Sequence, residues 1–349
     1  MIDSLEVANF RCYESLALHG LRRMNIVVGE NASGKTALLE SVFLTAGGSP
    51  ELVLRLRAWR GLGDFGTIPG DRTSYESLWK DLFWGFDQSR TITGQLVGSH
   101  ANTRAVRIAY QGEPIATLPF TKGGSESPLI VPITFEWKDA KGNISTSEVR
   151  ITREGLKLGG NVEIVPAYFF SSAILPNPTE NAGRFSELSK QGRQEGVIAA
   201  LKKQFPYIEN ISIEINAGIT MLYASVRHLS QKVPVGMLSA GINKLLSLLL
   251  ATAEKAQGVI LVDEIENGFY HKLMPGVWSA LLDSTRRHNT QLFATTHSAE
   301  CLEAMLPSVK GAEDDFCLIR TERHNGQTKV VLFSGRQLED AIHQRVDVR

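Results

Sequence analysis

The sequence lacks the features that mark secreted proteins, zinc modules and membrane proteins. Its 349 residues include only three cysteines, Cys12, Cys301 and Cys317, and no CxxC pair, which argues against a disulfide framework or a zinc module. The N-terminus has neither the charge nor the apolar run of a secretion signal, and the richest apolar stretch, 245–253, is too short to cross a bilayer. We therefore expect a cytoplasmic protein with no membrane contact, whose cysteines are packing residues.

The sequence also lacks an excess of either charge. Lys and Arg together number 37, as do Asp and Glu, so the formal net charge is zero. This balance removes the global electrostatic argument for nucleic-acid binding, although a local basic patch can exist on a neutral protein. A content of 43% hydrophobic and 21% charged residues is typical of a globular chain and argues against a disordered or collagen-like one.

Both ends of the chain show alternating strand and helix patterns. Near the N-terminus, apolar residues predict strands at 5–10 and 24–28, and helical spacing predicts a helix from Lys35 to Gly47. Towards the C-terminus the predicted elements are a helix from 239, a strand at 259–262, a helix at 271–287, a strand at 291–295 and a helix at 299–305. This alternation predicts an α/β fold with a parallel or mixed sheet flanked by helices.

The segment between residues 50 and 160 has a different pattern. Two helical stretches, 50–59 and 77–83, precede four candidate strands separated by turn signals, at 90–96, 106–110, 130–137 and 147–152. A helical segment at 184–204 and strands at 211–216 and 220–226 follow. We predict a single domain over 1–349, with its core from 1–48 and 165–320, an inserted β-rich and helical lobe at 50–160, and a C-terminal strand and helix at 321–349.

A phosphate-binding loop is predicted between the strand at 24–28 and the helix that follows. Residues 29–36, Gly-Glu-Asn-Ala-Ser-Gly-Lys-Thr, match GxxxxGK[ST] in the strand-to-helix context that this motif requires. Backbone N–H groups of such a loop surround phosphates at a helix N-terminus, Lys35 supplies a cation, and Thr36 offers its hydroxyl to Mg²⁺. The predicted nucleotide-binding residues are Gly29, Asn31, Ala32, Ser33, Gly34, Lys35 and Thr36.

Two carboxylates follow the buried strand at 259–262. A strand that ends in Asp263 and Glu264 brings them to the carboxyl edge of the sheet, where ligands bind in open α/β folds. Asp263 would then hold Mg²⁺, directly or through water, and Glu264 would act as the general base on the attacking water. A strand that ends in acids can also be a solvated turn, but the phosphate loop upstream favours the catalytic interpretation.

Two further segments lie at helix starts. Ser239, with Ala240 and Gly241, can simply cap its helix, or it can form a second phosphate site that faces the nucleotide of another subunit. His297, after the strand at 291–295, can cap or pack, or it can orient water near the γ-phosphate.

These segments, in this order, resemble the ABC-type ATPase heads of the structural-maintenance-of-chromosomes (SMC), RecF and overcoming-lysogenization-defect (OLD) group, over residues 1–48 and 165–320. The resemblance implies that Arg11 reaches the nucleotide, that 238–241 is the signature segment acting in trans, and that Glu266 and Asn267 belong to the D-loop. The Q-loop has no clear match, and Gln88 is its best-placed candidate. About fifty residues follow His297, too few for the nuclease domain of the OLD nucleases.

The expected function is therefore an ATP-hydrolysing molecular switch that uses ATP and Mg²⁺. The resemblance implies a homodimer or higher oligomer with ATP sandwiched between chains, serving as sensor or scaffold for a separate effector chain in bacterial anti-phage defence. The alternative is a RecF-like or SMC-like repair ATPase that binds DNA across the dimer. Arg55, Arg57 and Arg60, with Trp59 between them, could form a basic face for DNA, although an ion-paired helix face is the favoured interpretation. A transporter subunit and an intrinsic nuclease are weaker alternatives.

Overall fold

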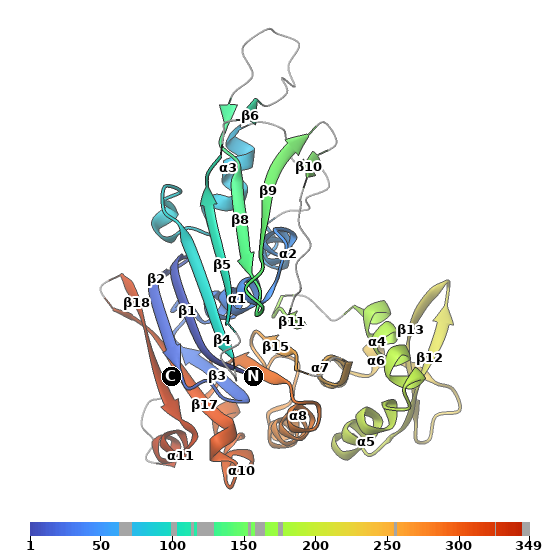
Figure 1. Cartoon of the computed structure of the whole chain (residues 1–349). Helices are drawn as coiled ribbons and strands as arrows, with labels where there is room; N and C mark the ends of the chain where they lie inside the picture. The colour runs from blue at the N-terminus through green and yellow to red at the C-terminus, as the bar shows by residue number, and fades with distance from the viewer. Residues whose placement is uncertain are drawn as a thin grey trace.

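The computed structural model of the chain describes residues 1–62, 72–98, 103–112, 115–116, 129–152, 155–157, 165–173, 177–254, 257–324 and 326–343. Two sheets form its centre, with helices between and around them (Figure 1). The predicted α/β architecture with flanking helices is confirmed. Among the described residues, no helix is long and apolar enough to span a membrane.

The first sheet has six strands in the order β11-β15-β16-β3-β17-β18 and is parallel apart from its last pair. The predicted strand bounds 259–262 and 291–295 match the structure. The strands are β3 (Met24–Gly29), β11 (Ala167–Phe170), β15 (Val259–Val262), β16 (Gln291–Thr295), β17 (Phe316–His324) and β18 (Gln327–Ser334). The four neighbours from β11 to β3 end at one edge of the sheet, because they are parallel and in register.

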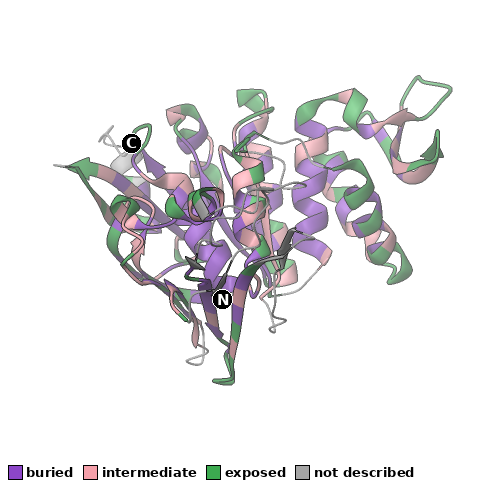
Figure 2. Ribbon diagram, turned by 90° about the horizontal axis from the view of Figure 1, so that it is seen from above, coloured by how far each residue is buried: buried purple, intermediate pink, exposed green. Residues whose placement is uncertain are grey.

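Both faces of this sheet are covered, because side chains alternate across a strand. Ile260 and Val262 belong to one core cluster with the apolar residues of α7 and α8, and Val259 and Leu261 belong to a second cluster with α1. The helices are α1 (Lys35–Ala46), α7 (Ala240–Glu254), α8 (Met274–His288), α9 (Ala299–Glu303), α10 (Leu306–Val309) and α11 (Gly335–His343). Figure 2 shows these buried layers through the centre of the molecule.

The second sheet has seven strands, antiparallel, in the order β10-β9-β8-β5-β4-β1-β2. Its strands are β1 (Ile2–Phe10), β2 (Tyr13–His19), β4 (Ile92–Gly98), β5 (Thr103–Tyr110), β8 (Ile133–Lys138), β9 (Ile144–Thr152) and β10 (Gly155–Lys157). The main strands of the predicted lobe at 50–160 therefore do not form a separate sheet: β1 pairs with β4, so the N-terminal strands and these lobe strands form one sheet. Helix α1 lies between the two sheets, and the Trp137 indole N–H donates to the Leu44 carbonyl at 3.4 Å.

Shorter elements complete this part of the chain. They are α2 (Glu51–Trp59), α3 (Arg72–Lys80), the 3₁₀ turns η1 (Trp84–Phe86), η3 (His271–Leu273) and η4 (Glu313–Asp315), and the two-stranded pair β6 (Ile115–Ala116) and β7 (Leu129–Ile130). The helix expected at 77–83 lies earlier, as α3, and the start of the helix expected at 271–287 is the turn η3.

A helical subdomain occupies the segment before α7. The single helical segment expected at 184–204 is two helices, α4 (Pro178–Lys190) and α5 (Gln194–Gln204), because Gly192 takes a left-handed conformation with φ 67° between them. The remaining elements are β12 (Ile208–Asn216), β13 (Ile219–Val226), β14 (Val233–Pro234) and α6 (Val235–Leu238). The hairpin of β12 and β13 projects at the right of Figures 1 and 2, and its tip is exposed.

Candidate nucleotide-binding site

A cavity of about 310 Å³ lies where β3 and β15 end and α1 begins, and we call it the P-loop cavity. Its lining includes the predicted residues Arg11, Asp263 and Glu264 and the whole of 31–36. Cys12, Ala37 and Arg60 also line it, although local sequence patterns did not predict them as site residues. The carboxyl edge of the parallel sheet therefore brings together residues that lie more than 200 positions apart in the chain.

The side chains of Thr321 and Tyr13 hold the loop 29–34 in place. Gly29 has φ 143°, and a Cβ there would lie 2.2 Å from the Thr321 carbonyl oxygen, so only glycine fits. The Ser33 and Thr321 hydroxyls are hydrogen-bonded at 2.6 Å, and the buried Tyr13 hydroxyl donates to the Gly34 carbonyl at 3.0 Å. These contacts hold the loop in the shape from which backbone N–H groups can bind an anion.

Lys35 and Thr36 begin α1, where the helix N-terminus carries partial positive charge. The Lys35 ammonium donates to the carbonyls of Gly29 at 2.7 Å and Glu30 at 2.9 Å. Burial lowers the pKa of Lys35, against the opposing attraction of nearby carboxylates, Asp263 foremost. The ammonium thus lies across the loop mouth, where phosphate oxygens would be its strongest partners.

Asp263 is buried at the end of β15 and accepts hydrogen bonds from hydroxyl groups. The Thr36 hydroxyl lies 3.1 and 3.2 Å from its two oxygens, and the Thr295 hydroxyl donates to Oδ1 at 2.7 Å. Ser172, just after β11, is 3.4 Å from Oδ2. Thr36 and Asp263 together present hydroxyl and carboxylate oxygens, the hard ligands that Mg²⁺ prefers, so this donor set fits the predicted metal.

Glu264 follows Asp263 in a left-handed conformation, with φ 50°. Asn267 donates from Nδ2 to its Oε2 at 2.5 Å, and the Lys244 ammonium donates to the backbone carbonyls of Glu264 at 2.8 Å and Asn267 at 3.1 Å. Burial lowers the pKa of Lys244 to about 8. Lys244 was not predicted; the available signal was its place on the helix that Ser239 begins, one turn from the start.

The predicted His297 lies outside the lining of the P-loop cavity and is half exposed. Its backbone N–H donates to Glu266 Oε1 at 3.1 Å, and its Nδ1 is 3.4 Å from the same oxygen. Glu266 thus orients His297, and Glu266 and Asn267 both belong to the turn after β15.

The predicted signature segment, 238–241, lies where α6 ends and α7 begins. Ser239 accepts a hydrogen bond from the Ile242 N–H at 3.0 Å, so the capping role predicted for it is present. Ser239 and Ala240 are exposed, while Gly241 is buried against the turn after β15, where a Cβ would lie 2.7 Å from the Gly268 carbonyl oxygen. None of these three residues lines the P-loop cavity of the chain that carries them.

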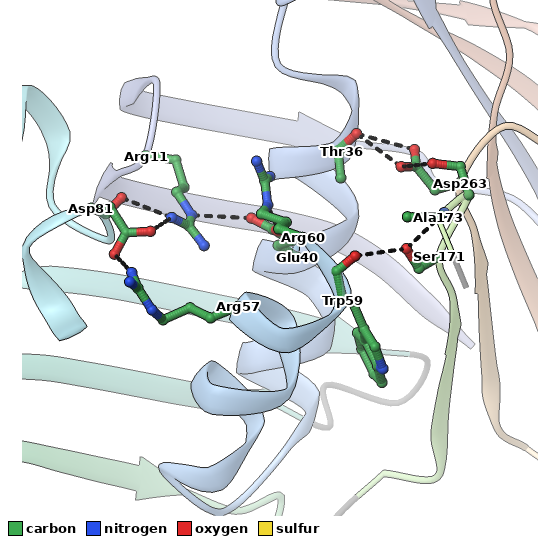
Figure 3. A network of polar contacts seen from close by, with 11 residues as sticks. Arg11, Thr36, Glu40, Arg57, Trp59, Arg60, Asp81, Ser171, Ala173 and Asp263 are labelled. Carbon is green, nitrogen blue, oxygen red and sulfur yellow. Dashed lines mark hydrogen bonds and ion pairs between the residues drawn. The ribbon is translucent and has the colours of Figure 1, made fainter. Parts of the chain in front are cut away.

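A cluster of paired charges forms the wall near Arg11 (Figure 3). The Arg11 guanidinium is paired with Glu40 at 3.1 Å and with Asp81, and Arg60 is paired with the other Glu40 oxygen at 2.6 Å. Arg57 is also paired with Asp81. Arg11 thus lines the cavity, and its charge is paired with the buried Glu40 and the partly buried Asp81. Its contact with a nucleotide stays a prediction.

The other residues of the proposed basic face are engaged as well. Arg55 pairs with Glu51 at 2.9 Å, and Trp59 stacks on Phe169 at a centroid distance of 5.2 Å. Together with the pairs of Arg57 and Arg60, these contacts agree with the ion-paired interpretation of that helix face.

The Q-loop candidate Gln88 is engaged in another part of the structure. Its amide donates to the Glu76 carbonyl at 3.1 Å and to the Tyr110 hydroxyl at 3.0 Å, in the antiparallel part of the molecule. It does not line the P-loop cavity, whereas Ser172 at the end of β11 contacts Asp263.

A phosphate loop, a strand that ends in two carboxylates and a histidine after the next strand, on this sheet order, are typical of a P-loop ATPase head of the ABC type, similar to those of SMC and RecF. The chain belongs to the family described as "AAA domain, putative AbiEii toxin, Type IV TA system", whose model matches residues 97–303. The predicted class is thereby confirmed.

Individual relatives agree with this class. An "ATP/GTP phosphatase" of Helicobacter pylori is 23% identical over 345 residues, covering 90% of each chain. A "DNA replication and repair protein RecF" of Lachnoclostridium phytofermentans is 52% identical over 46 residues, only 13% of each chain. The solved structure of an SMC head bound to the C-winged helix domain of ScpA superposes with a TM-score of 0.52 at 13% identity, over 98% of this chain and 99% of that one. At this identity the likeness shows the fold alone.

Proposed function

We propose that the protein is an ATP-driven switch in which two copies enclose two ATP molecules. Lys35 and the start of α1 bind the β- and γ-phosphates, and Thr36 and Asp263 hold Mg²⁺. Bound Mg²⁺ would neutralise charge on the phosphate oxygens. Asn267 holds Glu264 Oε2, so Oε1 is the oxygen that accepts the proton as water attacks the γ-phosphorus. His297, oriented by Glu266, contacts that phosphate group.

The exposed position of Ser239 is the main observation that supports the proposed dimer. Ser239 caps a helix whose N-terminus is a suitable phosphate site, yet it does not line the cavity of its own chain. A second copy can supply Ser239, Ala240 and Gly241 to that cavity, so each complete site takes Lys35 from one chain and Ser239 from the other. Each chain alone then contains two half sites.

Mixing two inactive variants tests this arrangement. Lys35→Ala and Ser239→Arg each disable both sites of their own dimer, but a mixed dimer contains one intact site. A 1:1 mixture, in which half the dimers are mixed, should recover about a quarter of the parent ATP turnover, because each mixed dimer has one working site of two. No recovery on mixing, with Ser239→Arg alone as active as the parent, would show that each chain works by itself.

We further propose that the switch controls a separate effector in bacterial defence. The description of the family names a putative toxin of a toxin–antitoxin system, and the similar SMC head was solved with a domain of another protein bound to it. The test is capture of partners from the native host in ATP, with Glu264→Gln compared with Lys35→Ala. One protein retained by Glu264→Gln and lost from Lys35→Ala is the expected result.

The alternative of a DNA-binding repair ATPase receives support from the local match to RecF. The ion pairs of Arg55, Arg57 and Arg60 count against it, because their charge is already neutralised. Salt-sensitive binding of duplex DNA in ATP would favour this alternative.

A further inference from the structure

Thr295 connects the two carboxylates of the site through one hydroxyl group. It is the last residue of β16 and is fully buried. Its Oγ1 donates to Asp263 Oδ1 at 2.7 Å and accepts the Glu264 backbone N–H at 2.7 Å. The Thr295 carbonyl also accepts the Ile265 N–H at 3.0 Å. One residue of β16 therefore contacts three consecutive residues that follow β15.

The geometry of the two strands explains this contact. β15 and β16 are parallel with Val262 opposite Ala294, so Thr295 ends its strand beside Asp263. Beyond Asp263 the chain turns sharply, since Glu264 has φ 50°, a conformation that residues other than glycine rarely adopt. The Glu264 N–H points back to β16 as a consequence, and the Thr295 hydroxyl accepts it.

The other donors to Asp263 are less suited to hold it during the reaction. Thr36 is itself a proposed metal ligand, so its hydroxyl cannot be reserved for Asp263. Ser172 is 3.4 Å away, at the limit of a hydrogen bond. Thr295 alone among these three combines a short contact with no other proposed role.

We propose that Thr295 is a positioning residue for ATP hydrolysis, which fixes the metal-binding carboxylate of Asp263 and the backbone of the base Glu264 relative to each other. This inference rests on the proposed roles of Asp263 and Glu264. A valine at 295 keeps the shape of the side chain but leaves the Glu264 N–H without its acceptor and Asp263 without its shortest donor. Phosphate binding at Lys35 does not involve Thr295, so the effect should fall on turnover and on the use of Mg²⁺.

The experiment compares Thr295→Val, Thr295→Ser and a matched control, Thr252→Val, with the parent. Thr252 is also buried, in α7, but its hydroxyl donates to the Leu248 carbonyl at 2.6 Å within the same helix. For each protein, kcat and KM for ATP are measured, together with the MgCl₂ concentration at half-maximal rate and the melting temperature. A purely structural role would lower the melting temperature without separating kcat from KM.

Thr295→Val should lower kcat about 10-fold, a loss of the order expected for one hydrogen bond of a positioned group, and leave KM for ATP within about 2-fold. It should raise the half-maximal MgCl₂ concentration about 3-fold, because a mobile Asp263 binds the ion less well. Thr295→Ser, which keeps the hydroxyl, and Thr252→Val should both stay within about 2-fold of the parent in every constant.

The proposal is overturned if Thr295→Val keeps kcat within 2-fold of the parent, or if Thr295→Ser loses as much as Thr295→Val. If Thr295→Val does not fold, Thr295→Ala replaces it with the same expected and contradicting results. If the parent itself does not hydrolyse ATP, the proposed function fails, and that outcome is distinct from an active parent with an equally active Thr295→Val.

Discussion

Two groups of charged residues contribute to the P-loop cavity, and their partners differ in kind. Figure 3 shows the first group together with Asp263 of the second. We call them the arginine cluster, which consists of Arg11, Arg57, Arg60, Glu40 and Asp81, and the strand-end cluster, which consists of Lys35, Lys244, Asp263, Glu264 and Glu266. In the arginine cluster, each carboxylate is paired with two guanidinium groups. In the strand-end cluster, Asp263 accepts only hydroxyl hydrogen bonds among the contacts described above.

The difference in partners indicates different roles for the two clusters, structural support for the first and chemistry for the second. A guanidinium neutralises a buried carboxylate and fixes it in place, so Glu40, with a side chain only 2% exposed, has little charge to offer a ligand. Hydroxyl groups orient Asp263 without neutralising it, which leaves its charge available for a divalent cation. We therefore propose that the arginine cluster stabilises one wall of the P-loop cavity and that the strand-end cluster provides its chemistry.

The largest effect should come from Lys35→Ala in the strand-end cluster. Loss of the cation that binds the β- and γ-phosphates should lower kcat/KM for ATP about 1000-fold, roughly 4 kcal/mol. Steady-state ATP turnover measures this, with Lys190→Ala as a control, since Lys190 is exposed and pairs only with Glu187 among the contacts described. If both variants lost kcat/KM equally, the loss would not be specific to Lys35, and the assignment of Lys35 to the site would be wrong.

Glu40→Leu should have the largest effect in the arginine cluster, on stability. It leaves the largely buried guanidinium of Arg11 and the partly exposed one of Arg60 without their carboxylate, which should cost about 3 kcal/mol of the free energy of unfolding. Urea unfolding followed by circular dichroism measures it. A variant as stable as the parent would show that the arginine cluster does not support the cavity wall.

The pH dependence of stability should distinguish Lys244 from the arginines. Burial lowers the Lys244 pKa from 10.5 to about 8, so between these values the unfolded chain binds the proton and the folded chain does not. The parent should therefore gain stability relative to Lys244→Met as pH rises from about 8 to 10.5, by at most about 3 kcal/mol. Urea unfolding at several pH values measures the difference, and a constant difference would contradict the assignment.

The smallest effect should come from Glu51→Gln. Glu51 and Arg55 form an exposed pair one turn apart on α2, and such pairs contribute less than about 0.5 kcal/mol. In the same urea unfolding experiment, the free energy of unfolding of this variant should equal that of the parent within about 0.5 kcal/mol, in contrast to Glu40→Leu. A loss of unfolding free energy as large as that of Glu40→Leu would mean that burial does not determine how much these ion pairs contribute to stability.

Local sequence patterns predicted the parts of the molecule that local patterns determine. The strands 259–262 and 291–295 were predicted to the residue, because each is a short apolar run bounded by polar residues. Lys35, Thr36, Asp263 and Glu264 follow from motif spacing, and the structure brings all four to one cavity.

Local sequence patterns could not predict the contacts between segments that are distant in the sequence. The pairing of β1 with β4 joins residues about 90 positions apart. The alternation of apolar and polar residues in a strand does not indicate which other strand it pairs with. Arg60, Lys244 and Thr295 acquire their places through similar long-range contacts. Ser172 follows a strand, β11, that was not predicted from the sequence.

The most direct test of the account is ATP turnover by Glu264→Gln at saturating ATP and Mg²⁺. The substitution keeps the size of the side chain and removes the base, so turnover should fall at least about 100-fold while ATP binding persists. A Glu264→Gln protein that hydrolyses ATP at the parent rate would contradict the assignment of chemistry to the strand-end cluster.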